Sequence, residues 1–354
     1  MSRLLRQIRL VAASCALLGF AAPSQGQSAW TIQPSASSEE AGFQGYLQLL
    51  AARARSEGVR ESTIQAMTSG LTFNPKVIAL DRSQPGASST STKVPAFAPY
   101  RRKHVDAARI AGGRTMYARV AGSAAAVERR YGVPAPILIA IWGHETNYGS
   151  YMGDFDLARS LATLAYEGRR RDLFTDEFIA LLKIADRGVP RSRMTGSWAG
   201  AFGNPQFLPS IYLRLAVDGD GDGDADIWNS RADTLASIAN YFRDAGWRTG
   251  QPWGVPARVP DSFDRSGVTA RLVAPECPRV HARHARWHTI GEWRARGVVP
   301  LAPIANDVMA SLIEPDGPGQ TAYLLTGNYR VILDYNCSNY YALSVGLLAD
   351  EIAR

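Results

Sequence analysis

The sequence contains little lysine, and this changes how its charge is interpreted. Of 39 basic residues only four are lysines, so arginine carries nearly all of the positive charge. The formal net charge is +7, and three of the arginines (Arg3, Arg6 and Arg9) lie in an N-terminal stretch without acidic residues. The rest of the chain is therefore only mildly basic. That balance is compatible with an anionic polymer but does not indicate DNA or RNA binding.

Long apolar runs are also missing. A membrane-spanning helix needs about 18 or more consecutive apolar residues, and no stretch reaches that length. The apolar run from Leu10 to Ala22 follows the three arginines and precedes the small and polar residues 23–26. This order of charged, apolar and cleavage regions predicts a secretory signal over residues 1–27 and export of the mature protein. Lipidation at Cys15 is the weaker alternative, because residues 12–14 make a poor lipoprotein box.

Cysteine is scarce, with three residues in the chain. If Cys15 is removed with the signal, Cys277 and Cys337 remain as a pair in a compartment where disulfides persist. A bridge between them would close a loop of about 60 residues and stabilise the fold by roughly 3–4 kcal/mol. A zinc site is the alternative, because three histidines follow Cys277 within residues 281–288. One helix face cannot easily wrap four ligands around an ion, so we expect the disulfide.

The pattern of the chain is that of a globular, helical protein. Hydrophobic residues make up 46% and charged residues 20% of the sequence, which argues against global disorder. Helical spacing of apolar residues predicts helices near 39–67, 105–131, 137–148, 157–166, 173–186, 209–216, 231–245 and 340–353. Between 253 and 333 short Val/Leu runs with many Pro and Gly predict a small β-containing insertion. The expected fold class is mainly α (α+β).

One predicted helix carries a carboxylate among large apolar side chains. Leu138, Trp142 and Glu145 lie on the same face of the helix over 137–149. Burial disfavours the charged form of a carboxyl group, so Glu145 should have a raised pKa, as a general acid near neutral pH requires. A helix-end glutamate that only forms a salt bridge is the alternative.

Residues 197–210 (SWAGAFGNPQFLPS) form a Gly-rich loop that carries an amide and aromatic rings. Such a loop suits the close approach of a sugar ring to backbone groups. Together with five further motifs, this loop and the helix of Glu145 resemble the membrane-bound lytic transglycosylase B family, peptidoglycan lyases with a lysozyme-like core. The further motifs are DRSQP at 81–85, LATL at 161–164 with Arg169-Arg170, the Asp-Gly run at 218–224, IANYF at 238–242, and YNCS at 335–338 with Tyr341-Ala342.

The resemblance implies that Glu145 is the single catalytic acid/base. In that family one carboxyl protonates the glycosidic oxygen between N-acetylmuramic acid and N-acetylglucosamine. It then takes the proton of the muramoyl C6 hydroxyl, which attacks C1 and gives a 1,6-anhydro product. Ordinary glycosidases need a second carboxylate, whereas here the internal hydroxyl and the N-acetyl group of the substrate take its place. No catalytic cofactor is expected.

The resemblance also assigns substrate contacts. The residues expected to line sugar subsites are Ser197, Gln206, Tyr241, Asn336 and Tyr341. Arg169 and Arg170 are expected to face the peptide stem or the lactyl carboxylate, because a guanidinium is well shaped for a carboxylate. Simple packing is the alternative for the tyrosines and the two amides. The Asn204-Pro205 pair stiffens the loop before Gln206, which could alter the glycan that fits.

Five parts of the chain follow from these patterns and the resemblance. They are the signal (1–27), an N-terminal helical segment and loop packing on the core (28–98), the lysozyme-like catalytic core with the Asp-Gly loop (99–252), the β-containing insertion (253–333), and a C-terminal helix that closes the cleft (334–354). The expected location is the periplasm, in soluble or peripherally wall-associated form. The expected partner is the peptidoglycan glycan strand, with no nucleic acid. Other cell-wall proteins stay open as partners, and a monomer is favoured.

The Asp-Gly run matches the first half of an EF-hand loop. The oxygen ligands expected at positions 1, 3, 5 and 7 are Asp218, Asp220, Asp222 and Asp224. Position 12 is Asn229 instead of glutamate, and Asp233 in the next helix is expected to substitute for it. Carboxylates this close would repel one another without a cation, so we expect a weak structural Ca²⁺ site. A solvated acidic turn is the alternative.

Three functional interpretations remain at this point. The leading one is an exported peptidoglycan lytic transglycosylase. A hydrolytic muramidase would admit water and cut the same bond. A non-catalytic murein-binding protein would use the same cleft without a chemical step.

Overall fold

The computed structural model describes residues 36–84, 95–270 and 277–354. The predicted signal over residues 1–27 lies outside this range, as does Cys15. The described chain divides into two compact units, one made of residues 95–151 and 215–354 and the other of residues 36–84 and 152–214. The predicted core over 99–252 is therefore divided between the two units.

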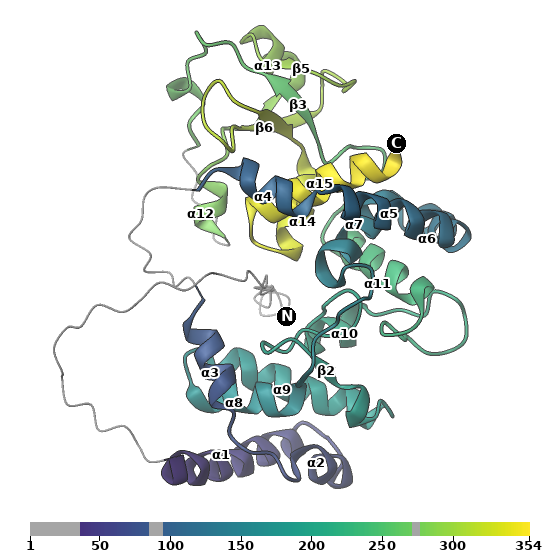
Figure 1. The fold of residues 1–354 in the computed structure, drawn as a ribbon, viewed down its shortest axis with the longest axis vertical. Helices are drawn as coiled ribbons and strands as arrows, with labels where there is room; N and C mark the ends of the chain where they lie inside the picture. The colour runs from purple at the N-terminus through teal and green to yellow at the C-terminus, as the bar shows by residue number, and fades with distance from the viewer. Residues whose placement is uncertain (1–35, 85–94, 271–276) are drawn as a thin grey trace, which may run out of the picture. The chain divides into compact units, whose positions relative to one another are not determined.

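The first unit is mainly helical. Its longer helices are α4 (Phe97–His104), α5 (Ala107–Arg119), α6 (Ala121–Tyr131), α7 (Ala135–Thr146), α11 (Arg231–Asp244), α14 (Gly327–Tyr335) and α15 (Asn339–Ala353). The C-terminal helix α15, yellow in Figure 1, packs against α4, α5 and α7. On another side of α7 lie α6 and α11, which also pack against each other. Helix α7 is thus enclosed by helices from both ends of the unit's sequence.

Helix α7 follows directly from its residues. Pro136 stands in its first turn, where a missing amide hydrogen costs nothing. The side chains from Ile137 to Trp142 are all buried, so the helix is apolar on every side. It ends at Thr146 because Asn147 takes a left-handed conformation with φ of 48°.

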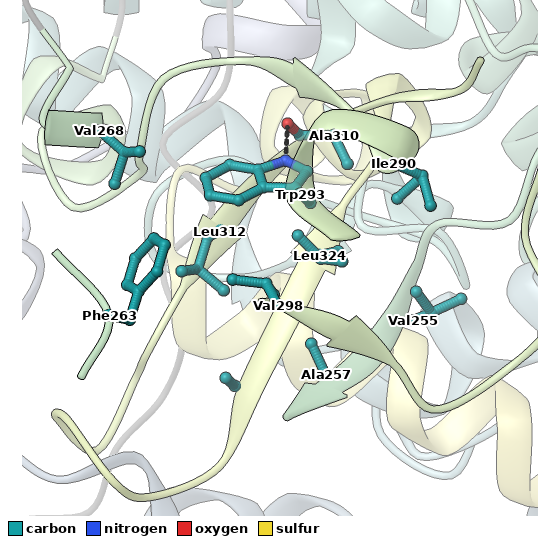
Figure 2. Close-up of a cluster of buried hydrophobic side chains, with 11 residues drawn as sticks. Val255, Ala257, Phe263, Val268, Ile290, Trp293, Val298, Ala310, Leu312 and Leu324 are labelled. Carbon is teal, nitrogen blue, oxygen red and sulfur yellow. Dashed lines mark hydrogen bonds between the residues drawn. The ribbon is translucent and has the colours of Figure 1, made fainter. Parts of the chain in front are cut away.

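A small antiparallel sheet completes the first unit. Its strands are β3 (Gly254–Arg258), β4 (His288–Thr289), β5 (Val299–Pro300), β6 (Met309–Ile313) and β7 (Ala322–Leu325), in the order β4-β6-β7-β3-β5. Two short helices, α12 (Pro278–His281) and α13 (Ile290–Ala295), lie between β3 and β5 in the sequence. Figure 2 shows the core of this sheet around the fully buried Trp293, whose Nε1 donates to the carbonyl of Ala310 at 2.9 Å. The small β-containing element that the sequence predicts is confirmed, with its strands between residues 254 and 325.

The second unit consists of helices with one two-stranded pair. Its elements are α1 (Ala36–Ser56), α2 (Glu61–Thr68), α3 (Pro75–Arg82), β1 (Phe155–Asp156), α8 (Leu157–Glu167), α9 (Arg171–Asp186), β2 (Thr195–Gly196) and α10 (Pro209–Leu215), the last of which ends at the unit boundary. Helices α8 and α9 pack against each other, and α1 packs against both. An aromatic cluster of Phe43, Phe73 and Tyr166 joins α1 to α8.

The fold class is the one that the sequence predicts: mainly helical, with a small β-containing element. Among the described residues, no helix has both the length and the apolar character that crossing a membrane requires.

Candidate active site

Glu145 lies in the last turn of α7. Its side chain is partly exposed, whereas the preceding residues Ile141 and Trp142 are buried. Burial of the carboxyl group raises the pKa of Glu145 to about 7, and a hydrogen bond from Tyr341 offsets part of this rise. A carboxyl with this pKa carries a proton on a large fraction of molecules at neutral pH. This is the behaviour that the sequence predicts for a general acid.

Tyr341 is the hydrogen-bond partner of Glu145. It lies in the first turn of α15, and its hydroxyl donates to Glu145 Oε1. Burial and the nearby charge of Glu145 hold the pKa of Tyr341 well above its usual value, so the hydroxyl stays a donor. The turn is fixed by Ser338, whose Oγ accepts from the Tyr341 amide at 3.3 Å. The structure thus brings together two of the predicted site residues, Glu145 and Tyr341, which are 196 residues apart in the sequence.

His144, beside Glu145, ties α7 to α15 a second time. Its Nδ1 lies 2.9 Å from the Ala140 carbonyl oxygen and its Nε2 lies 2.7 Å from Ser344 Oγ. Burial lowers the pKa of His144 to about 3, so the ring is neutral at pH 7. Ser344 Oγ donates to the Tyr341 carbonyl at 2.8 Å, so it joins the His144 ring to the first turn of α15. Two consecutive residues of α7 are therefore bonded to α15.

Sequence reasoning missed two aromatic neighbours of Glu145. Burial and the charge of Glu145 raise the pKa of Tyr100, on α4, to about 12. The same two causes raise the pKa of Tyr335, at the end of α14, well above its usual value. Tyr335 stands inside the YNCS motif, which was a usable signal. The sequence around Tyr100 gives no comparable signal, because only folding brings α4 beside α15.

Tyr241 and Asn336 lie in the same unit as Glu145 and are buried, at 4% and 6% exposed. The Tyr241 hydroxyl donates to the Asp334 carbonyl at 2.7 Å, and its ring meets Tyr335 edge-on at 4.8 Å. The backbone carbonyl of Asn336 accepts from Ser338 at 2.7 Å. Both residues support the segment that leads into α15, and the role predicted for them in binding sugar stays a prediction.

Ser197 and Gln206 lie in the second unit, in the Gly-rich loop. Gln206 has a positive φ of 51°, and its Nε2 donates to the carbonyls of Met152 and Gly203 at 3.0 and 3.1 Å. Ser197 Oγ accepts from the Ala201 amide at 3.0 Å. These bonds fix the loop and engage the nitrogen end of the Gln206 amide. The oxygen end is the acceptor that a sugar hydroxyl would use.

Arg169 and Arg170 both bind Asp81 in the second unit. Arg169 Nη2 donates to the Asp81 carbonyl at 2.8 Å, and Arg170 Nη2 donates to its Oδ1 at 2.6 Å. Asp81 is 1% exposed, so two arginines compensate one buried carboxylate. Both guanidinium groups remain partly exposed. The sequence did not predict Asp81 as their partner, because it lies in another motif about 90 residues earlier.

Cys277 and Cys337 form a disulfide, as predicted. The bond joins α12 to the segment between α14 and α15. A second link reinforces it: Asn339 Nδ2 donates to the Val280 carbonyl at 2.9 Å, and its Oδ1 lies 2.7 Å from His284 Nε2. His284 therefore has a packing role, as expected when the zinc alternative was set aside.

The Asp-Gly loop brings three carboxylates together. Oxygen atoms of Asp218, Asp220 and Asp222 lie within 4.8 Å of one another. Backbone amides of Gly221 and Gly223 donate to Asp218, at 2.5 and 2.9 Å, which lowers the pKa of that carboxyl. Hard oxygen ligands at this spacing fit Ca²⁺.

Asp233 and Asp224 are placed differently from the other three. Asp233 is fully buried, and its two oxygens accept from the amides of Gly219 and Asp226, both at 2.8 Å. It thus ties the two ends of the loop to α11, and its expected part as a substitute for the ligand at position 12 stays a prediction. Asp224 is outside the carboxylate cluster, and its Oδ1 accepts from the Ala225 amide at 2.8 Å.

Comparisons with known proteins show which proteins this chain resembles. A family model described as a transglycosylase SLT domain matches residues 42–350. The membrane-bound lytic murein transglycosylase B of Escherichia coli strain K12 is 31% identical over 275 residues, which cover 75% of this chain and 72% of that protein.

Solved structures give the same result. SltB3 from Pseudomonas aeruginosa, in complex with NAG-anhNAM-pentapeptide and with NAG-NAM-pentapeptide, has a TM-score of 0.78 and 40% identity, covering 88% of this chain and 79% of that one. The Escherichia coli lytic transglycosylase Slt35 in complex with calcium has a TM-score of 0.68 and 27% identity, covering 89% and 93% of the two chains.

Proposed function

The chain belongs to the transglycosylase SLT family, and on that premise we propose that it is a lytic transglycosylase that cleaves peptidoglycan. The bond cut is the one between N-acetylmuramic acid and N-acetylglucosamine, and the product carries 1,6-anhydro-N-acetylmuramic acid. The observation that carries the proposal is the Glu145 carboxyl, with a pKa of about 7 and a hydroxyl donor on one oxygen.

Glu145 acts first as an acid and then as a base. Because Tyr341 donates to Oε1, Oε2 is the oxygen that gives its proton to the glycosidic oxygen. The resulting carboxylate is stabilised by the Tyr341 hydroxyl, which stays protonated. It then accepts the proton of the muramoyl C6 hydroxyl as that oxygen bonds to C1. The same atom thus exchanges a proton in both directions, and no second carboxylate is needed.

Other residues would hold the substrate. Gln206 offers its amide oxygen and Ser197 its hydroxyl to sugar groups, since both lie in a loop fixed by internal bonds. Arg169 and Arg170 keep exposed guanidinium surface beside Asp81 for a stem or lactyl carboxylate. Asn336 takes part from the segment that leads into α15.

We also propose export to the periplasm by the signal over residues 1–27, and a monomeric enzyme whose partner is the glycan strand. The cluster of Asp218, Asp220 and Asp222 would hold a structural Ca²⁺ ion. That ion would offset the mutual repulsion of the carboxylates and has no part in the chemical step.

The test is digestion of purified murein by the wild-type protein and by Glu145→Gln, with product masses measured. The wild-type enzyme should release anhydro-muropeptides, each lighter by one water than the hydrolysed form, and Glu145→Gln should release none. A muramidase would give the hydrolysed masses instead. Equal biological activity of the two proteins would favour the non-catalytic binding protein.

Glu177→Gln is the matched control for this test. Burial also raises the pKa of Glu177 to about 7, but this residue lies in α9 of the second unit and is fully buried. Its substitution should leave the product masses unchanged. Loss of the anhydro product in both variants would show that a buried glutamate matters for folding and not for the chemistry.

A further inference from the structure

The chain directly after the catalytic helix has an uncommon backbone. Asn147, Tyr148 and Gly149 have φ of 48°, 59° and 86° in succession. Asn and Gly enter the left-handed region readily, but a bulky aromatic residue there is an outlier. Such a conformation persists only where its surroundings fix it. The contacts of Tyr148 therefore deserve an explanation.

Three glycines from two helices surround the Tyr148 ring. A methyl group at Gly143 of α7 would lie 2.6 Å from Cε1 and Cζ of the ring, and one at Gly112 of α5 would lie 2.9 Å from Cε2. A methyl group at Gly113, also on α5, would lie 2.7 Å from the hydroxyl oxygen. Interiors are too densely packed to allow such approaches. The ring thus fills a slot that only glycine leaves open.

The Tyr148 ring accounts for Gly112 and Gly143, whereas Gly113 also faces Ile352, which a methyl group there would approach to 2.5 Å. All three lie inside helices, where glycine is less favourable than alanine because it loses more backbone freedom. None of them ends a helix. The free-energy cost of placing glycine inside these helices is explained if the ring of Tyr148 must lie between α5 and α7.

The polar end of Tyr148 closes the contact. Its hydroxyl donates to the Arg109 carbonyl at 2.7 Å, and Arg109 Nη1 donates to the Gly143 carbonyl at 3.0 Å. Burial raises the pKa of Tyr148 far enough to keep this hydroxyl protonated. Tyr148, Arg109 and Gly143 are therefore linked in a ring of contacts between α5 and the last turn of α7. Glu145 is in that turn.

We propose that Tyr148 is a positioning residue for the acid/base step, which locks the last turn of α7 to α5 and so sets the direction of Glu145. On its other side the same turn is held by α15, through His144 to Ser344 and Glu145 to Tyr341. Glu145 is thus clamped between two helices, and Tyr148 supplies the α5 half. This inference rests on the proposed lytic activity of Glu145.

The first test compares Tyr148→Ala with Tyr148→Phe. The phenylalanine variant keeps the ring in its slot, so its kcat should stay within about threefold of wild type. The alanine variant frees the turn, and a displacement of about 1 Å at a catalytic group can lower kcat about 10²-fold. KM should change little in both, because Tyr148 is not assigned a substrate contact. Circular dichroism and thermal unfolding verify that each variant is folded.

The pH dependence of kcat separates positioning from general damage. A loosened turn exposes the Glu145 carboxyl to water, which lowers its pKa. In Tyr148→Ala the limb of the pH–rate profile that is set by Glu145 should therefore move to lower pH. The groups facing Glu145 are Tyr100 of α4, Tyr335 of α14 and Tyr341 of α15. Burial raises the pKa of all three hydroxyls far above this range, so they do not set the limb.

The second test fills the slot from the other side. Gly143→Ala should lower kcat as Tyr148→Ala does, because the new methyl group expels the ring. Gly122→Ala is the control, since a methyl group on that glycine of α6 meets nothing within 4 Å and should leave kcat unchanged. The double variant Gly143→Ala/Tyr148→Ala should be no slower than Tyr148→Ala alone, because the ring that clashes is gone.

The outcomes distinguish this inference from the function on which it rests. If the wild-type protein forms no anhydro product, the function itself is wrong. If it does, but Tyr148→Ala keeps the wild-type kcat and pH limb, only the positioning role is wrong. Additive losses in the double variant, or an equal loss in Gly122→Ala, would also overturn the role.

Discussion

The raised pKa of Glu145 has a consequence for stability that can be measured. An ordinary glutamate in the unfolded chain has a pKa of 4.5, whereas burial raises the pKa of Glu145 to about 7 in the folded protein. Between these two values the folded state binds more protons than the unfolded state, so stability falls as the pH rises through this window. Above pH 7 this loss of stability is complete, and the difference between the two pKa values corresponds to about 3 kcal/mol of unfolding free energy.

Glu145→Gln removes this loss because glutamine has the same shape and cannot ionise. The variant should have the same free energy of unfolding as wild type at pH 4, where Glu145 is protonated in both states. At pH 8 it should be more stable than wild type by about 2–3 kcal/mol, a range that allows for the partial exposure of the side chain. The stabilised variant should at the same time be inactive, as expected where a site trades stability for function.

Urea unfolding at pH 4, 6 and 8 measures this effect, with the first unit followed by its own transition if the two units unfold separately. Tyr341 donates to Oε1 in the glutamine variant as well, so the comparison leaves that contact in place. If Glu145→Gln has the same stability relative to wild type at all three pH values, the carboxyl is not held protonated by the fold, and the acid/base argument fails with it.

Three further predictions concern the Tyr341 hydroxyl, the Asp-Gly loop and the disulfide. Tyr341→Phe removes the hydroxyl that lowers the pKa of Glu145, so the limb of the pH–rate profile set by Glu145 should move to higher pH. The value of kcat should fall about 10²-fold. If the limb stays at the wild-type pH, the hydrogen bond from Tyr341 to Glu145 does not act on the pKa as described. The melting temperature of the wild-type protein should be higher in Ca²⁺ than in EDTA. Asp220→Asn should abolish this difference, whereas Asp264→Asn, which lies outside the loop, should retain it. Equal melting temperatures of the wild-type protein in Ca²⁺ and in EDTA would exclude the ion. Replacing both disulfide cysteines by serine should lower the free energy of unfolding, measured in urea, by about 3–4 kcal/mol. An unchanged free energy of unfolding would show that the disulfide does not stabilise the fold.

The sequence predicted what depends on local periodicity. The apolar residues spaced three and four apart before Glu145 predicted a raised pKa for its carboxyl group, because such residues share one side of a helix. The change of pattern after residue 253 identified the sheet for a similar reason. The pairing of Cys277 with Cys337 needed only the expected compartment and the lack of other cysteines in the mature chain.

Contacts between distant segments could not be predicted in this way. Arg169 and Arg170 were expected to face a carboxylate of the substrate, and their bonds to Asp81 could not be predicted from spacing. The bond from the Tyr241 hydroxyl to the Asp334 carbonyl was not predicted either. Tyr100 gave no signal at all. In each case the partner is fixed by how helices pack, which the spacing of residues within one helix does not contain.

The two buried glutamates show why a raised pKa by itself does not identify a catalytic acid. Burial raises the pKa of both Glu145 and Glu177 to about 7. Glu177 has no exposed surface, and its oxygens accept from the amide and the hydroxyl of Ser210 at 2.9 and 2.6 Å, at the start of α10. Its two oxygens are engaged in holding that helix start and are closed to a substrate.

Glu145 differs in access and in its partner. Its side chain is partly exposed, and the hydrogen bond from Tyr341 engages one oxygen. In the proposed mechanism the proton on the other oxygen goes to the glycosidic oxygen, whereas both oxygens of Glu177 accept from Ser210. Desolvation raises the pKa of both carboxyls alike, so exposure and hydrogen-bond partners distinguish the carboxyl proposed as the acid/base from the one that holds the start of α10.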